Sequence, residues 1–475
     1  MANPLKQLAG ETAIYGFSSI LARVLNFLFV PVYTRLLTRV QYGVVTEFMA
    51  YIAILQVVLV LGLETGCFRF ANKEGEDPRK VYSGALLAVS GLNLAFLAVM
   101  AAFSGSISAA LGYAGYRSLI VCVAGILFCD SVTAILFAKL RQEHKAVKFA
   151  VFKTVKILTE TGANLLLFFV WPAQPDFTYP VFAIFASCVL CLLLFIPDLV
   201  RLRPVWDGAV VRRMLLYSLP LMVAALPGVA NDFLDRVLFR YLDTSSEAWR
   251  ASLGVYQAAV KLAVIMNLFI QMFRYAAEPF FFQRARDKDS RRLYAEVMEY
   301  FTAFCGLVFL GVIAYIDLIS LFLGKDFRAG VGVVPVMLLS YMLLGMLFNV
   351  SMWYKLSGKT DMAVWITLAG LAVTAAVNVV FMPRYSYWAS AFGHLASYSV
   401  MLLLCAWLGN KYYPIPYRWK RIGLLFLLTG VFYAGIVLCQ RAVAPLGLRL
   451  ALNTGLLAAY GLSAWKLISK KHIYA

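Results

Sequence analysis

Long apolar runs recur through the whole sequence and constrain its fold more than any other feature. A transmembrane helix needs about 20 mostly apolar residues to cross the hydrocarbon core of a bilayer, where its backbone polar groups pair within the helix. Runs of this kind lie at 10–33, 44–64, 82–103, 117–138, 149–171, 178–198, 214–239, 253–274, 298–323, 331–354, 362–382, 386–408, 421–440 and 446–466. The sequence therefore predicts an all-α integral membrane protein with about 14 transmembrane helices.

Charged residues are few and lie mostly in the connections between these runs. The chain is 62% hydrophobic and 14% charged, a composition that does not suit a soluble protein of 475 residues. A net charge of +19 is typical of nucleic-acid-binding proteins, but here the lysines and arginines form short clusters between apolar runs. We therefore exclude nucleic acid as a partner. The connections are also too short to hold a soluble catalytic domain.

The eight cysteines predict neither a disulfide framework nor a metal site. Seven lie within apolar runs, and Cys67 lies at the end of one. Cys188 and Cys191 have the spacing of a metal or redox motif, but no histidine is near them in the sequence. We expect these two thiols to pack in the interior, and we expect no metal and no cofactor.

Positive charge is distributed unevenly between the two sides of the predicted helices. With both termini in the cytoplasm, 27 lysines and arginines fall in cytoplasmic segments and 10 on the opposite side. Cytoplasmic loops of membrane proteins carry such an excess. The sequence therefore predicts a multi-pass protein with both termini cytoplasmic. Residues 1–10 lack the pattern of a signal peptide.

A short motif that occurs twice indicates an internal repeat. LARVL at 21–25 returns 213 residues later as LDRVL at 234–238, and a Gly/Tyr turn into the next span follows each copy. Spans one to six and seven to twelve therefore predict two parallel six-helix repeats, as in transporters whose halves rock about a central site. The predicted organisation is two lobes around a central cavity, at 1–203 and 204–410, with an extra helix pair and a short cytoplasmic tail at 411–475.

Corresponding residues mark the two repeats: Arg23, Pro31, Arg35 and Tyr42-Gly43 in the first, and Pro220, Asp235-Arg236 and Gly254-Val255-Tyr256 in the second. On these residues the chain resembles the multidrug/oligosaccharidyl-lipid/polysaccharide (MOP) exporter superfamily, and in particular its Wzx-type oligosaccharide-lipid flippases. A terminal helix pair outside a twelve-helix core also fits this superfamily.

This resemblance implies a transporter rather than an enzyme. It implies a flippase that carries an undecaprenyl-diphosphate-linked oligosaccharide across the bacterial inner membrane by alternating access, for the synthesis of O-antigen, capsule or exopolysaccharide. The implied partners are this lipid-linked substrate, membrane lipids and other membrane proteins of polysaccharide assembly. The sequence has no GxxxxGK[ST] stretch for ATP, so we expect a coupling ion (H⁺ or Na⁺), the membrane potential or consumption of product to drive transport.

Cations inside the predicted spans are the candidate substrate ligands, because a charge in lipid is costly unless it faces a cavity or a partner. The cations within spans are Arg23, Lys153, Lys156, Arg236, Lys261 and Arg274. At most five acids accompany these six cations, and such an excess suits a diphosphate, whose oxygens accept bidentate hydrogen bonds from arginine. The predicted substrate-binding residues are Arg23, Arg35, Lys153, Lys156, Arg236 and Lys261.

Span five carries three charged residues on one helical face. Lys153, Lys156 and Glu160 are spaced i, i+3, i+7. One interpretation is an internal pair of Lys156 with Glu160; the other is that at least one lysine faces the cavity. Asp130 and Glu47 are lone acids in other spans, and we interpret each as a packed polar contact.

Span seven carries the second group of charged residues. Asp232 and Asp235, together with Glu160, are predicted charge partners or ion-coupling groups. Neutralisation of Arg236 by Asp235 at the outer end of the span is the structural alternative. Pro220 and Pro227 each remove a backbone hydrogen bond, so they predict structural kinks or a hinge.

Two other functions remain open. A drug exporter of the same superfamily would show efflux of cationic dyes that depends on Asp232 or Asp235. A membrane oligosaccharide polymerase or ligase would need a substantial outer loop with catalytic residues, whereas the longest outer loops here run about a dozen residues.

Overall fold

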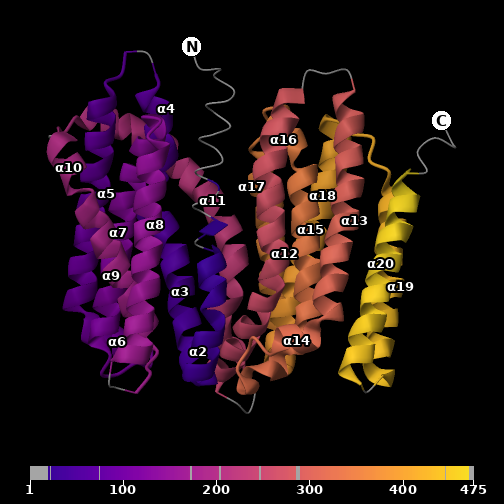
Figure 1. Ribbon diagram of the computed structural model, residues 1–475. Coiled ribbons are helices and arrows are strands. Elements are labelled where there is room, and N and C mark those ends of the chain that lie inside the picture. The colour runs from indigo at the N-terminus through magenta and orange to yellow at the C-terminus, as the bar shows by residue number, and fades with distance from the viewer. Residues whose placement is uncertain are drawn as a thin grey trace. The chain divides into compact units, whose positions relative to one another are not determined.

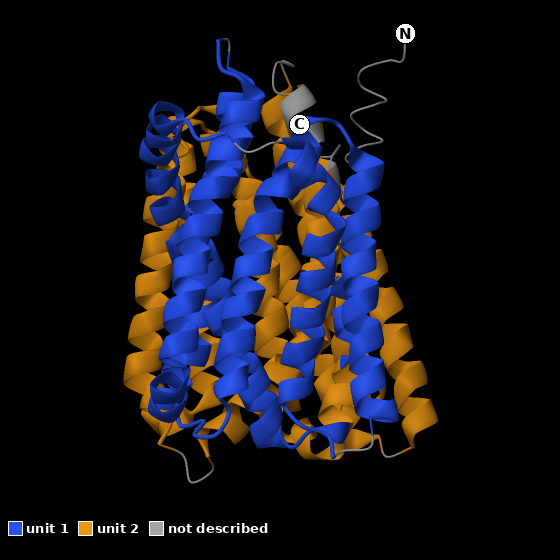
Figure 2. Cartoon of the chain, turned by 90° about the vertical axis from the view of Figure 1, so that its left-hand side faces the viewer, with its two compact units in different colours: residues 1–29, 36–240 blue, residues 30–35, 241–475 orange. Residues whose placement is uncertain are grey.

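The computed structural model describes residues 16, 20–21, 23–73, 75–171, 174–202, 205–244, 248–284, 289–443 and 445–469. Over these residues every regular element is a helix, so the predicted all-α fold is confirmed (Figure 1). Contacts between residues divide the chain into two compact units, which Figure 2 shows in different colours. Unit 1 is Met1–Phe29 with Leu36–Arg240, and unit 2 is Val30–Arg35 with Tyr241–Ala475.

Unit 1 holds most of the helices from the first half of the chain. They are α3 (Arg39–Leu59), α4 (Leu63–Ala71), α5 (Pro78–Ala102), α6 (Ser104–Ala110), α7 (Arg117–Gln142), α8 (Ala146–Leu165), the π-helical turn η1 (Leu166–Val170), α9 (Thr178–Leu194), α10 (Ile196–Leu202) and nearly all of α11 (Gly208–Leu242).

Unit 2 holds the helices of the second half, together with most of α2 (Val30–Leu36). The helices that follow α11 are α12 (Trp249–Arg284), α13 (Ser290–Ala314), α14 (Ile316–Ser320), the 3₁₀ segment η2 (Lys325–Val333), α15 (Val334–Val350), α16 (Met352–Leu356), α17 (Met362–Tyr385), α18 (Tyr387–Tyr412), α19 (Trp419–Ala442) and α20 (Leu446–Ser469).

The number of spans is lower in the described residues than the sequence predicts. Ten helices are long and apolar enough to cross a membrane, or eleven if α9 and α10, bent by 42°, count as one span. The predicted count of 14 is not confirmed. Span 10–33 is only partly described, because residues 10–15, 17–19 and 22 lie outside the described residues. Span 149–171 is α8 with η1, whose lysines and glutamate lower its apolar character, and span 446–466 is α20, which is less apolar than the other long helices.

Local sequence signals explain where several helices begin. Thr38 Oγ1 accepts a hydrogen bond from the backbone N–H of Gln41, and Gln41 Oε1 accepts one from Thr38 N–H, which is a capping box at the start of α3. At α5 the carboxylate of Asp77 accepts from the N–H of Arg79, and Pro78 takes the first helical position. Both helices therefore begin where their own residues satisfy the free N–H groups.

Helix α7 is central to unit 1. It contacts α3, α4, α5, α8 and α9, and its buried residues are spread around the helix, as in a helix enclosed by others. The break between α3 and α4 lies at Gly62, whose φ of 66° is left-handed. A Cβ at Gly62 would lie 2.6 Å from the carbonyl oxygen of Ser218, so glycine is needed for the close approach of α11.

Helix α11 runs as one helix from Gly208 to Leu242 through both prolines. Pro220 is exposed and Pro227 is buried. The predicted hinge at these positions stays a prediction. The predicted lobes 1–203 and 204–410 also stay a prediction, and the contacts place α11 up to Arg240 with unit 1.

In unit 2 the terminal pair α19 and α20 packs on α13. Tyr460 Oη of α20 donates to the carbonyl oxygen of Ala303 at 3.1 Å and lies 3.1 Å from Thr429 Oγ1 of α19. A Cβ on Gly306 of α13 would lie 2.0 Å from this Tyr460 oxygen, so glycine makes room for the contact. The pair is thus joined to α13 by polar contacts as well as by apolar packing.

Candidate functional site

A charged cavity lies within unit 1, between helices α3, α4, α7 and α8. Its volume is about 330 Å³. Three cations and two carboxylates are among the residues that line it, which are Gln56, Glu64, Asp130, Thr133, Ala134, Phe137, Arg141, Phe149, Lys153 and Lys156. The cavity thus brings together five charged side chains from α4, α7 and α8.

Helical periodicity explains how α7 and α8 present these residues. On α7, Asp130, Phe137 and Arg141 are spaced i, i+7, i+11, so they lie on one face. On α8, Lys153 and Lys156 are spaced i, i+3 and share a face in the same way. The cavity lies where these two faces meet.

Lys156 forms an ion pair with Asp130 across this cavity. The two side chains are 17% and 27% exposed, so the pair is partly withdrawn from solvent. Of the two carboxylates that could pair with Lys156, the direct ion pair is therefore with Asp130 rather than with Glu160. The helical spacing alone brings Lys156 and Glu160 near each other, but α7 supplies a carboxylate that Lys156 contacts directly.

The other two cations have different neighbours. Arg141 Nη2 lies 3.2 Å from Glu64 Oε2. The ammonium group of Lys153 lies 4.3 Å from the ring centroid of Phe137, in a cation–π arrangement. Two cations of the cavity therefore face carboxylates, and Lys153 faces an aromatic ring.

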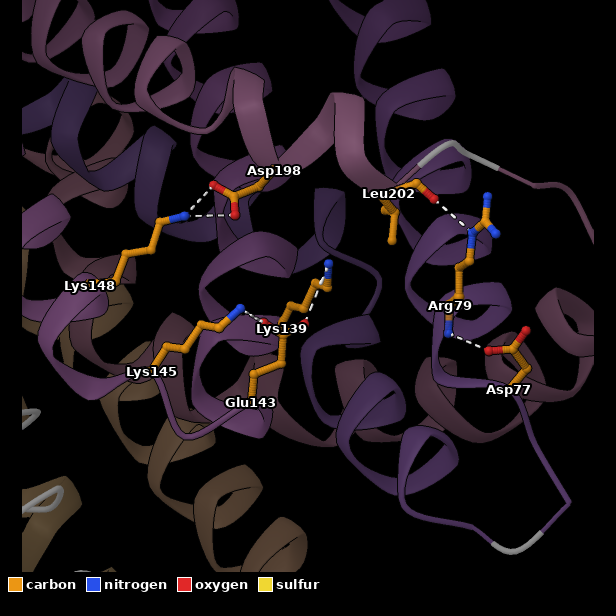
Figure 3. A network of polar contacts seen from close by, with 8 residues as sticks. All are labelled: Asp77, Arg79, Lys139, Glu143, Lys145, Lys148, Asp198 and Leu202. Atoms are coloured by element: carbon orange, nitrogen blue, oxygen red, sulfur yellow. Dashed lines mark hydrogen bonds and ion pairs between the residues drawn. The ribbon is translucent and has the colours of Figure 1, made fainter.

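Salt bridges outside the cavity hold the ends of these helices (Figure 3). Lys148 in the first turn of α8 lies 2.7 Å from both carboxylate oxygens of Asp198 in α10. Glu143, at the end of α7, accepts from Lys145 at 2.6 Å and lies 3.5 Å from Lys139. The turn between α7 and α8 is thereby fixed, and with it the positions of Arg141 and Lys153.

A second polar cluster in unit 1 surrounds the buried carboxylate of Glu47 on α3. It accepts hydrogen bonds from Tyr51 Oη at 2.7 Å, from Tyr113 Oη, and from Arg240 Nη1 of α11 at 3.2 Å. Its side chain is fully buried, and that of Arg240 is 13% exposed. The interpretation of Glu47 as a packed polar contact thus has named partners, which the sequence did not identify.

The remaining predicted site residues lie elsewhere among the described residues. On α11 the guanidinium of Arg236 stacks on Phe233 at 4.4 Å, the carboxylate of buried Asp235 accepts from the backbone N–H of Arg236 at 2.8 Å, and Asp232 is exposed. Arg23 is exposed in the helical residues 23–28.

Two predicted cations belong to unit 2. Lys261 is half-buried in α12, and Arg35 of α2 donates to the carbonyl oxygen of Leu321 at 3.2 Å. Of the predicted substrate-binding set, the described residues bring only Lys153 and Lys156 together at the unit 1 cavity.

Sequence reasoning missed two charged residues of the cavity. Glu64 stands at the edge of span 44–64, and Arg141 was counted among the cytoplasmic loop cations. The spacing of Asp130 and Arg141 on one face of α7 was the available signal. A charge near the end of a span does not by itself show whether it faces water or a cavity.

Comparison with known proteins identifies the family. A model of the family described as "Polysaccharide biosynthesis protein" matches residues 8–285, which is more than half of the chain. In a comparison with curated proteins, no sequence matches.

Solved structures show the same fold. The lipid II flippase MurJ in an inward closed conformation has a TM-score of 0.74 at 13% identity, covering 97% of this chain and 100% of that one. An inward-facing MATE family multidrug resistance transporter of the MOP superfamily has a TM-score of 0.65 at 12% identity, covering 85% and 95%. A MATE protein in complex with MaD3S has a TM-score of 0.61 at 12% identity, covering 89% and 97%.

These likenesses are to transporters and a flippase rather than to enzymes. Together with the ten or eleven apolar helices of the described residues, they describe a multi-pass membrane protein. The predicted resemblance to the MOP superfamily is confirmed. The chain belongs to the polysaccharide biosynthesis protein family.

Proposed function

We propose that this protein is a flippase that moves an undecaprenyl-diphosphate-linked oligosaccharide across the bacterial inner membrane for the synthesis of a cell-surface polysaccharide. The observation that carries the proposal is the charged cavity of unit 1 in a protein of this family. Arg141, Lys153 and Lys156 are the donors there that suit the oxygens of a diphosphate. The lipid II flippase with the same fold supports a lipid-linked substrate.

The position of the cavity along α7 and α8 suits loading from the cytoplasm. In the predicted topology, the turn between these helices is cytoplasmic, so Arg141 and Glu64 stand at the cytoplasmic end of the cavity. Lys156 lies eleven residues after Lys145, the residue just before α8. At a rise of 1.5 Å per residue, this places Lys156 about 16 Å along the helix from the cytoplasmic turn. A headgroup entering from the cytoplasm would meet Arg141 first and Lys156 last.

We further propose that transport occurs by alternating access, with Arg23, Arg236 and Lys261 serving as further cations on the route of the headgroup. A site that opened to both sides at once would let the lipid gradient leak. Rocking of two units that keep their own packing is the least costly way to avoid this.

The direct test is reconstitution in liposomes with a fluorescent diphosphate-linked lipid oligosaccharide. We expect the purified protein to move the label between leaflets, and a Lys153→Met/Lys156→Met variant that inserts normally to move it far more slowly. Protein-free liposomes supply the background rate. No movement above this rate with the intact protein would contradict the proposal.

The same preparation separates the other two functions. The fold shared with a multidrug transporter favours drug export as the second candidate. Efflux of a cationic dye that is lost in Asp232→Asn or Asp235→Asn would support drug export instead. Lengthening or transfer of the glycan by the purified protein alone would support a polymerase or ligase.

A further inference from the structure

The cations that line the unit 1 cavity stand close to carboxylates. Arg141, Lys153 and Lys156 are three cations of its lining, and Glu64 and Asp130 are two carboxylates of it. A further carboxylate, Glu160, is outside the lining, one helical turn after Lys156 on the same face of α8. A dianionic diphosphate would therefore enter a site whose cations already have counter-charges.

Such a ligand has to compete with the carboxylates for the cations. Asp130 is the nearest competitor, because it contacts Lys156 directly, whereas Glu64 faces Arg141 at 3.2 Å near the end of α7. If diphosphate oxygens take over the ammonium group of Lys156, the carboxylate of Asp130 loses its ion-pair partner in a partly buried site, where the Cys188 thiol remains its neighbour. An uncompensated charge in such a place is strongly disfavoured.

We infer that a diphosphate binds in this cavity together with a proton, which the carboxylate of Asp130 accepts. This inference rests on the proposed function, since it takes the diphosphate of a lipid-linked substrate as the ligand. The step forms one O–H bond on Asp130 from a solvent proton and breaks no bond of the diphosphate. When the diphosphate leaves, Lys156 returns to Asp130 and the proton is released.

The surroundings of Asp130 favour it as the acceptor. The titratable and charged groups that face it from the neighbouring elements are Glu64 on α4, Cys129 and Arg141 on α7, Lys153, Lys156 and Glu160 on α8, and Cys188 and Cys191 on α9. Lys153 and Lys156 are positively charged and become occupied by the ligand. The Glu64 side chain is 41% exposed, so water can solvate it when the diphosphate engages Arg141, whereas Asp130 is 27% exposed and loses more when Lys156 is taken.

The coupling of proton uptake to diphosphate binding makes the affinity depend on pH in one direction. Because a proton is taken up on binding, the affinity for the diphosphate rises as the pH falls. One fully linked proton changes Kd by about tenfold per pH unit. The proton also reduces the net negative charge that has to cross the membrane with each substrate molecule.

Isothermal titration calorimetry of the full chain in detergent tests the inference. The probe is farnesyl-diphosphoryl-N-acetylglucosamine, a diphosphodiester that keeps the same charge around neutral pH. Titrations at pH 7 in buffers of low and high ionisation enthalpy give the number of protons taken up. We expect about one proton for the unaltered protein. This measurement needs no variant, so it stands even if a substitution prevents folding.

Variants then locate the proton. Asparagine resembles a permanently protonated aspartate. In Asp130→Asn we therefore expect the binding enthalpy to be the same in both buffers, and the probe to bind at least as tightly as to the unaltered protein. Asp130→Glu keeps a titrating group and should keep the uptake. Glu160→Gln is the matched control on α8 and should also keep it. Loss of uptake in Glu160→Gln but not in Asp130→Asn would overturn the assignment to Asp130.

The outcomes separate this inference from the proposed function. Binding of the probe without proton uptake would overturn the inference and leave the flippase proposal standing. No binding of the probe, or equal binding of farnesyl-N-acetylglucosamine without its phosphates, would overturn both.

Discussion

The backbone N–H of Gly324 donates a 3.0 Å hydrogen bond to Oγ1 of Thr34, which stands 290 positions earlier in the chain. Next to it, Arg35 donates to the carbonyl oxygen of Leu321. Residues Val30–Arg35 are therefore held by unit 2, whereas the residues before and after them belong to unit 1. The chain therefore passes from one unit to the other three times, after Phe29, after Arg35 and after Arg240.

The contact at Gly324 leaves no room for a side chain. A Cβ there would lie 1.9 Å from the carbonyl oxygen of Thr34, so Gly324→Ala forces the backbone apart. We expect a loss of stability of about 1–3 kcal/mol, as for other overpacked sites, visible as a lower Tm in detergent. Gly423→Ala on α19 is the control, because nothing lies within 4 Å of its Cβ, and it should leave Tm unchanged or slightly higher. Equal Tm values for the two variants would contradict this account of the contact.

The buried carboxylate of Glu47 should depend on Arg240. Arg240→Ala removes the cation and leaves a fully buried charge, so we expect a loss of about 3–5 kcal/mol and little folded protein. Glu47→Gln combined with Arg240→Gln removes both charges and should recover much of the loss. Tyr51→Phe removes one neutral donor and should cost about 1 kcal/mol. Fluorescence-detected gel filtration after heating compares all three; an Arg240→Ala variant as stable as Tyr51→Phe would show that the pair is not needed.

The two arginines of the repeated motif should matter for transport and not for folding. We expect Arg23→Ala and Arg236→Ala to abolish flipping in liposomes while the protein inserts normally. Arg23→Lys should restore only part of the activity, because lysine lacks the planar fork of arginine. Circular dichroism and Tm serve as the folding controls. Full flipping by Arg23→Ala at normal protein levels would leave this arginine with a structural role only.

The predicted topology rests on the distribution of lysine and arginine, with 27 in the segments assigned to the cytoplasm and 10 on the opposite side. Single cysteines at Lys145, in the turn between α7 and α8, and at Tyr116, just before α7, should lie on opposite sides of the membrane. In a background without the native cysteines, a membrane-impermeant maleimide applied to intact cells should label position 116 and not position 145. Labelling of both positions from outside would contradict the assignment of spans.

The helices themselves were predictable because apolar length is a local property of the sequence. Spans such as 82–103 and 362–382 correspond closely to α5 and α17. The break at Gly62 and the bend between α9 and α10 arise from tertiary packing and backbone geometry. The hydrophobic pattern of the sequence does not predict either of them. The first span remains a prediction, because residues 10–15, 17–19 and 22 of it lie outside the described residues.

The candidate site was less predictable, for a physical reason. Spacing shows which residues share a face of one helix, as for Lys153 and Lys156 on α8, but it does not show which neighbouring helix that face meets. The contact of Lys156 with Asp130 depends on the rotation of α7 against α8. For the same reason the sequence did not identify Arg141 as a cavity residue, because a cation near the end of a helix resembles a cation of the following loop.

The polar docking of α19 and α20 has a consequence for biogenesis. Glu299 on α13 is buried, and its neighbours are Arg418 at 3.4 Å and Arg421 at 3.6 Å, while Asp317 after α13 meets Arg449 of α20 at 2.9 Å. Ribosomes complete α13 more than a hundred residues before they reach Arg418. During synthesis, α13 is therefore inserted before the two arginines that neighbour Glu299 have been made. Nascent chains stalled before Arg418 should be recognised as unfinished by membrane chaperones or proteases, although every helix up to α18 has already been made.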